Sequence, residues 1–147
     1  MSRILGIDHG TVRVGLALSD EMELVASPLK TLPNSPNIVH EIAQLVRAKH
    51  VKKVVVGLPI RMDGQKGSAT ERVEKFADLL GKALEHDIPV EFADERLSSK
   101  TAERALKRDG HEIIPQEGLV DQLAATVILQ DYLNSQRGPD SYLLPED

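Results

Sequence analysis

Residues 3–18, RILGIDHGTVRVGLAL, open the chain with two apolar runs around a short polar turn. The run at residues 3–7 is short and apolar, and residues 12–18 are rich in β-branched and small apolar side chains. Both compositions predict β-strands, joined by a turn at His9-Gly10-Thr11. A third extended segment over residues 23–32 is interrupted by Pro28, which predicts a strand near a sheet edge. The first third of the chain is therefore predicted to be an antiparallel meander.

Beyond residue 35 the pattern changes to helices alternating with strands. Ile38, Ile42, Leu45 and Val46 share one helical face. Residues 53–58 contain Val54-Val55-Val56, an apolar run typical of a central parallel strand. Ser68-Ala69-Thr70-Glu71 matches a capping box that opens a second helix, and residues 89–93 form the fifth strand.

Two further helices are predicted after the fifth strand. Ser98 or Ser99 caps the first of them, and the last runs over residues 117–133 with an inner stripe of Leu119, Leu123, Val127 and Ile128. This order predicts an α/β fold with a mixed five-stranded sheet and helices on both faces. We expect one domain over residues 1–138 and a short tail over residues 139–147.

Composition narrows the chemistry that is available. The 147 residues include no cysteine, so disulfides and thiolate sites are excluded and metal ligands must be oxygen or imidazole. A net charge of -5 argues against binding nucleic acid by overall charge, so a local basic patch would be needed. No apolar stretch is long enough for a signal peptide or a membrane span, so we expect a cytoplasmic protein without a membrane partner.

Acidic residues follow the predicted strands at their carboxyl ends, where ligands collect in open α/β sheets. Asp8 ends the first strand between Gly6 and Gly10, which allow close approach. Taken alone, Asp8 favours a simpler interpretation as a turn residue. Asp94-Glu95 closes the fifth strand, and because side chains alternate along a strand only one of the two faces the site; we favour Glu95. The simpler interpretation of this pair is a solvated acidic surface.

Asp121 lies in the first turns of the last helix, on the same side as Ala125 and Ile128. Small Ala124 and Ala125 would let this helix approach the sheet and bring Asp121 near the end of the first strand. An acid near a helix N-terminus also has a purely structural explanation. Together, however, Asp8, Glu95 and Asp121 predict a carboxylate cluster, which a divalent cation such as Mg²⁺ or Mn²⁺ would neutralise. Such a site suits phosphodiester hydrolysis.

Four motifs in this order carry a resemblance to a known family. They are Gly6-Ile7-Asp8-His9-Gly10-Thr11, Gly57-Leu58-Pro59 with Met62-Asp63-Gly64, Asp94-Glu95-Arg96-Leu97-Ser98, and Asp121 with Ala124-Ala125. The sequence resembles, almost from end to end, the YqgF (RuvX) proteins, described as pre-16S rRNA nucleases and related in fold to RuvC-type Holliday junction resolvases.

The resemblance implies an RNase H-like fold, a cytoplasmic role in ribosome biogenesis by trimming the 5′ end of pre-16S rRNA, and Asp8, Glu95 and Asp121 as the acidic residues. Relatives often carry proline or an aromatic residue where this chain has His9. RuvC-type resolvases have a further acid three residues before their last one, where this chain has Gly118.

Several cations are candidates for phosphate contacts. They are Arg13, Arg61, Lys66, Arg96, Lys100 and Arg104, with Lys107 and Arg108 extending the helical stripe. A solvated helix face explains that stripe equally well. Only four aromatic residues are present, two Phe and two Tyr, so stacking on bases is limited and recognition of backbone and shape is expected.

Three alternatives to an RNA nuclease remain open. The same site could cut four-way DNA junctions, for which a symmetric dimer would be expected, and the chain itself could be a monomer or a homodimer. The Asp8–Thr11 segment also resembles the phosphate-binding turn of sugar kinases and actin-like ATPases, which need two such domains. Finally, the fold could serve as a non-catalytic RNA- or ribosome-binding module.

Overall fold

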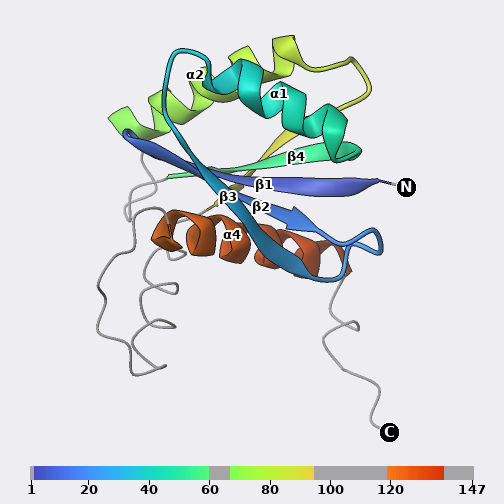
Figure 1. The fold of residues 1–147 in the computed structure, drawn as a ribbon. Coiled ribbons are helices and arrows are strands. Elements are labelled where there is room, and N and C mark those ends of the chain that lie inside the picture. The colour runs from blue at the N-terminus through green and yellow to red at the C-terminus, as the bar shows by residue number, and fades with distance from the viewer. Residues whose placement is uncertain (1, 60–66, 95–118, 138–147) are drawn as a thin grey trace, which may run out of the picture.

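Residues 2–59, 67–94 and 119–137 are described in a computed structural model, and they form a mixed sheet between two layers of helix (Figure 1). The strands are β1 Arg3–His9, β2 Arg13–Ser19, β3 Ala26–Pro33, β4 Val51–Leu58 and β5 Val90–Asp94. Their order in the sheet is β3-β2-β1-β4-β5. The β1–β2 and β2–β3 pairs are antiparallel, whereas β1–β4 and β4–β5 are parallel. The predicted five-stranded mixed sheet, its opening meander and the edge position of β3 are confirmed.

Helices cover both faces of this sheet, as predicted. Helices α1 Ile38–Ala48 and α2 Ser68–Ala83 lie on one face, and α4 Leu119–Arg137 lies on the other (Figure 1). The helix predicted after Ser98 or Ser99 lies outside the described residues, as do the residues of the predicted tail. The parallel strands β1, β4 and β5 end together at His9, Leu58 and Asp94, and we call this border of the sheet the carboxyl edge.

Side chains of alternate residues supply two separate cores. In β1, Leu5 and Ile7 pack against α1 and α2, whereas Ile4 packs against α4. The same alternation divides β4, where Val54 and Val56 belong to the first core and Val55 to the second. A strand buried on both faces must be apolar throughout, which explains the continuous valine run.

Helix α4 approaches the sheet through Ala124, Ala125 and Ile128, as predicted, but the other members of the predicted stripe are not buried. Its buried residues are Ala124, Ala125, Ile128, Leu129, Tyr132 and Leu133, whereas Leu119 is 37% exposed and Leu123 and Val127 are half-buried. The reason is that α4 lies very close to β1 at Gly6. A Cβ atom built on Gly6 would lie 2.7 Å from the Leu129 Cβ and 3.2 Å from the Ala125 carbonyl oxygen. The small residues therefore decide which side of α4 faces the sheet.

The start of α2 also differs from the predicted capping box. Gly67, not Ser68, is the N-cap, and Ser68 is the first helical residue. Thr70 is buried, its Oγ1 accepts a hydrogen bond from the Gly67 N–H at 3.3 Å, and its hydroxyl donates to the Pro59 carbonyl. A buried hydroxyl needs such partners, so Thr70 rather than Ser68 provides the side-chain hydrogen bonds. These bonds tie the first turn of α2 to the segment that follows β4.

Candidate active site

Asp8 lies at the carboxyl edge, on the face of the sheet that α4 covers. Leu5 and Ile7 face α1 and α2, so alternation along β1 directs Asp8 to the other side. Its Cα partner on the neighbouring antiparallel strand β2 is Gly15. Such partners lie about 4.5 to 5.5 Å apart. The main chain of Gly15 is thus directly beside Asp8.

Gly15 is also the point where α4 touches the sheet most closely. A Cβ atom built on Gly15 would lie 2.0 Å from the Asp121 carbonyl oxygen and 2.9 Å from the Asp121 Cβ. Only a residue without a side chain fits there. Asp121, from the first turn of α4, therefore rests on the residue that pairs with Asp8. The structure brings these two predicted residues to either side of Gly15, although they come from opposite ends of the chain.

Arg13 supplies positive charge to this pair of acids. Its Nε donates a hydrogen bond to the Asp121 Oδ2 at 2.9 Å. The side chains of Arg13 and Asp121 are 44% and 22% exposed, so water screens the ion pair and its contribution to stability is at most about 1 kcal/mol. An exposed guanidinium beside a carboxylate site is well placed to contact a phosphate.

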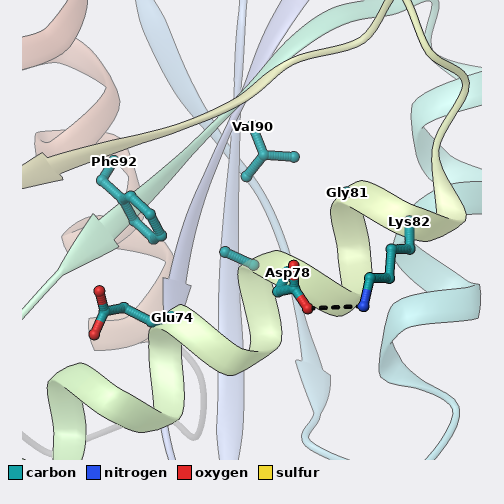
Figure 2. A pocket seen from close by; sticks show the side chains of 7 residues that line it. Glu74, Asp78, Gly81, Lys82, Val90 and Phe92 are labelled. Carbon is teal, nitrogen blue, oxygen red and sulfur yellow. Dashed lines mark ion pairs between the residues drawn. The ribbon is translucent and has the colours of Figure 1, made fainter.

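The alternation of side chains along β5 shows on which face of the sheet Asp94 lies. Ala93 packs on the core beneath α4, whereas Val90 and Phe92 line a groove against α2 together with Glu74, Ala77, Asp78, Gly81 and Lys82 (Figure 2). Alternation then places Asp94 on the α2 face, opposite to Asp8. Asp94 is therefore not brought to the Asp8–Asp121 pair, which agrees with the preference for its neighbour. Glu95 itself lies outside the described residues.

The other predicted contacts to nucleic acid cannot be placed. Arg61, Lys66, Arg96, Lys100 and Arg104 lie outside the described residues, as do Lys107 and Arg108.

Within residues 2–59, 67–94 and 119–137, no three His, Asp or Glu side chains gather as a metal site. In the same part of the chain, no helix is long and apolar enough to cross a membrane.

His9 turns away from the acids and packs beneath α2. It is 6% exposed and its ring stacks on Phe76 with 4.2 Å between the ring centroids. The Arg72 Nε donates to the His9 Nδ1 at 3.4 Å. Burial, and secondly the charge of Arg72, lower the pKa of His9 to about 4. His9 is therefore neutral near pH 7 and is part of the core, not of the carboxylate site.

The depressed pKa of His9 predicts a loss of stability in acid. The value is 6.5 in an unperturbed histidine and about 4 here, so as the pH falls the unfolded chain takes up the proton first. The contribution of neutral His9 to the free energy of unfolding is complete above pH 6.5 and lost by pH 4. At about 1.4 kcal/mol for each pH unit, the loss between pH 6.5 and 4 is at most about 3.5 kcal/mol. Urea unfolding in EDTA between pH 7.5 and 4 measures it.

The control for this prediction is His9→Phe, which keeps a ring to stack on Phe76 but cannot titrate. Its unfolding free energy should fall less steeply over the same pH range than that of the wild type. Equal slopes would show that His9 is not the group responsible.

The turn after Asp8 is held by side chains that the sequence patterns did not single out. Asn34 Nδ2 donates to the Gly10 carbonyl oxygen at 2.9 Å, and the Gly10 N–H donates to the Arg13 carbonyl oxygen at 2.9 Å. Arg72 Nη2 donates to the His9 carbonyl oxygen at 3.0 Å. Asn34 follows Pro33 at the end of β3, and an asparagine at such a position is also typical of an ordinary turn. Arg72 is one of several charged residues on α2 and carries no local signal.

Comparisons with known proteins identify the family of this chain and agree with this fold. The model of the RuvX family, described as Holliday junction resolvase, matches residues 2–135. A relative from Chloroflexus aggregans is 42% identical over 92% of this chain and 96% of its own. One from Syntrophus aciditrophicus is 46% identical over 90% of this chain and 89% of its own. Both bear a name that describes a pre-16S rRNA nuclease.

Solved structures of junction resolvases share the fold. RuvC of T. thermophilus, in complex with a Holliday junction substrate, superimposes with a TM-score of 0.59 at 20% identity, covering 94% of this chain and 97% of its own. Fowlpox virus resolvase, in complex with Holliday junction DNA, gives a TM-score of 0.58 at 11% identity, covering 92% of this chain and 99% of its own. At such identities the likeness concerns the fold alone, and it confirms the predicted RNase H-like class.

Proposed function

The chain belongs to the RuvX family, and from this premise we propose that it is a divalent-metal-dependent nuclease that hydrolyses phosphodiester bonds in the pre-16S rRNA during ribosome biogenesis. The observation that carries the proposal is the meeting of Asp8 and Asp121 across Gly15 at the carboxyl edge. Two carboxylates at neighbouring positions repel each other, and a structure keeps such a pair where a cation or substrate uses it.

The donor set fits a hard divalent cation. Asp8 and Asp121 offer carboxylate oxygens, which Mg²⁺ and Mn²⁺ prefer, and the chain has no cysteine to favour a softer metal. We propose Glu95 as the third ligand because Asp94 lies on the α2 face and the next position of an extended strand would point the other way. The metal would supply an activated water and would stabilise the leaving oxygen.

The protein's own residues would orient the substrate around these carboxylates. Arg13, already 2.9 Å from Asp121, would bind an oxygen of the scissile phosphate. The buried and neutral His9 would not exchange protons with the substrate, because it faces α2. We further propose that Arg61, Lys66, Arg96, Lys100 and Arg104 contact the phosphate backbone away from the cut.

Two candidate functions, an RNA nuclease and a DNA junction resolvase, differ in their substrate. The names of the relatives favour RNA, whereas the description of the family favours a four-way DNA junction. The test is cleavage of a pre-16S rRNA 5′ fragment, a four-way DNA junction and unstructured RNA, each with Mg²⁺, Mn²⁺ or EDTA. We expect metal-dependent cleavage of the rRNA fragment alone. Cutting of the junction alone would reverse the choice, and cleavage of none of them would favour a non-catalytic binding module.

Arg13→Ala tests the role of the exposed guanidinium. Without its charge beside Asp121, Mn²⁺ affinity should rise a few-fold, because a competing cation is removed. RNA affinity should fall, and the slope of log Kd against log salt should decrease by about 0.7 to 0.9, the value of one lost phosphate contact. Calorimetry measures the first quantity and fluorescence anisotropy the second. Lys30→Ala, which removes a charge from β3, is the control, and an unchanged salt slope in Arg13→Ala would exclude the phosphate contact.

A further inference from the structure

Arg72 joins α2 to the strand end that carries Asp8. Its Nη2 donates to the His9 carbonyl oxygen at 3.0 Å, and its Nε donates to the His9 Nδ1 at 3.4 Å. Two donors of one planar guanidinium thus hold the main chain and the side chain of the same residue. His9 is buried and stacked on Phe76, which also belongs to α2. The last residue of β1 is therefore fixed to α2 by three separate contacts.

The geometry of the His9 ring fits this arrangement, because the ring stacks on Phe76 while its Nδ1 faces the Arg72 Nε. Nδ1 can accept the Arg72 hydrogen bond only if the ring proton resides on Nε2. The stacked ring and the adjacent guanidinium exclude water on the α2 side. Asp8 is the residue immediately before His9 and points to the opposite face. Asp8 and His9 share a peptide bond, so a displacement of His9 would move this peptide and with it the Asp8 side chain.

The far side of the same turn has its own support. Asn34, the residue after β3, donates a hydrogen bond from its Nδ2 to the Gly10 carbonyl oxygen at 2.9 Å. The turn is thus held at His9 by α2 and at Gly10 by the residue after β3. Side chains that hydrogen-bond a metal ligand contribute about 10- to 100-fold to metal affinity or activity, and Arg72 and Asn34 act one step further out, on the residues that follow Asp8.

We propose that Arg72 is a positioning residue of the active site, which orients Asp8 by holding the His9 peptide from the opposite face of the sheet. This role rests on the proposed function, because Asp8 must be a catalytic ligand for its orientation to matter. A different role for Arg72 would be direct contact with the substrate phosphates through its remaining N–H donors. The two roles affect different measurable quantities.

The experiment compares Arg72→Ala, Arg72→Gln and Arg72→Lys with Lys75→Ala, which removes an exposed cation from the same helix. Mn²⁺ affinity is measured by the electron paramagnetic resonance signal of free Mn²⁺, and kcat and KM by cleavage of the rRNA fragment. Circular dichroism shows which variants are folded at the assay temperature. We expect Arg72→Ala to weaken Mn²⁺ binding about tenfold and to lower kcat about 10- to 100-fold, with KM and the salt dependence of RNA binding unchanged.

Conservative variants separate positioning from a charge effect. Glutamine keeps an N–H donor for the His9 carbonyl without the charge, so Arg72→Gln and Arg72→Lys should both recover part of the kcat lost in Arg72→Ala. A loss of about 0.7 to 0.9 in the salt slope, with recovery by lysine alone, would assign Arg72 to the substrate phosphates and overturn the proposal. Wild-type Mn²⁺ affinity and kcat in a folded Arg72→Ala would overturn it as well.

Failure of the underlying function has a different signature. A wild-type protein that binds no Mn²⁺, or Asp8→Asn with wild-type cleavage, would contradict the carboxylate site itself. Wild-type binding and an inactive Asp8→Asn, together with an unaffected Arg72→Ala, would contradict only the positioning role.

Discussion

Asp8→Asn is expected to lower kcat about a thousandfold and to leave the folded protein as stable as the wild type, or more so. The amide keeps the size of the side chain but removes one of the two charges that meet across Gly15. Loss of a ligand to a catalytic metal removes several kcal/mol of transition-state stabilisation, and about 1.4 kcal/mol corresponds to a factor of ten in rate. Loss of a like charge from a carboxylate cluster relieves repulsion in the metal-free protein. Cleavage assays and urea unfolding in EDTA measure the two effects.

Asp94→Asn is the matched control for this prediction. Asp94 is an acid at the same carboxyl edge, but it lies on the α2 face of β5. Its kcat should stay within about threefold of the wild type, since it faces away from the carboxylate site. Equal losses in Asp8→Asn and Asp94→Asn would mean that the catalytic site is not where Asp8 and Asp121 meet.

The fold could be predicted because its elements carry strong local patterns. The valine run of β4 is apolar at every position because two cores bury it, and no solvent-facing helix has that pattern. The edge position of β3 followed from Pro28, which cannot donate a hydrogen bond to a neighbouring strand. The exposure of Leu119 in α4 could not be predicted in this way. It depends on how closely Ala125 and Leu129 approach Gly6, a contact between residues far apart in the chain.

In the candidate site, too, some features follow from local sequence patterns and others depend on contacts between distant residues. The juxtaposition of Asp8 and Asp121 was expected from strand ends and helix spacing, and Gly15 now explains how the helix comes so close. The contribution of Arg72 was missed because nothing in the helical pattern of α2 distinguishes an arginine that reaches the end of β1 from one in solvent. Roles that depend on tertiary hydrogen bonds have no local sequence signal. Glu95 lies outside the described residues, so its role as a ligand stays a prediction.

Gly15→Ala is expected to disrupt the active site and the docking of α4 together. The added methyl carbon would lie 2.0 Å from the Asp121 carbonyl oxygen and 2.3 Å from its carbonyl carbon, well inside contact distance. These are main-chain atoms of a helix packed on the sheet, so no side-chain rotation can relieve the clash and the first turn of α4 must move. Inserting one carbon into a packed core costs about 1 to 3 kcal/mol, and a shift of about 1 Å at a catalytic carboxylate costs about 100-fold in rate.

Gly81→Ala is the matched control for Gly15→Ala, because the nearest atom to its added carbon is the Val90 Cγ2 at 4.0 Å, an ordinary contact. In the interior of α2, alanine should stabilise the protein by about 0.5 to 1 kcal/mol and leave kcat unchanged. The same chemical change is therefore expected to act in opposite directions at the two glycines. If Gly15→Ala instead retains wild-type stability and activity, then α4 does not need to lie against Gly15, and Asp121 would lose the contact that places it beside Asp8.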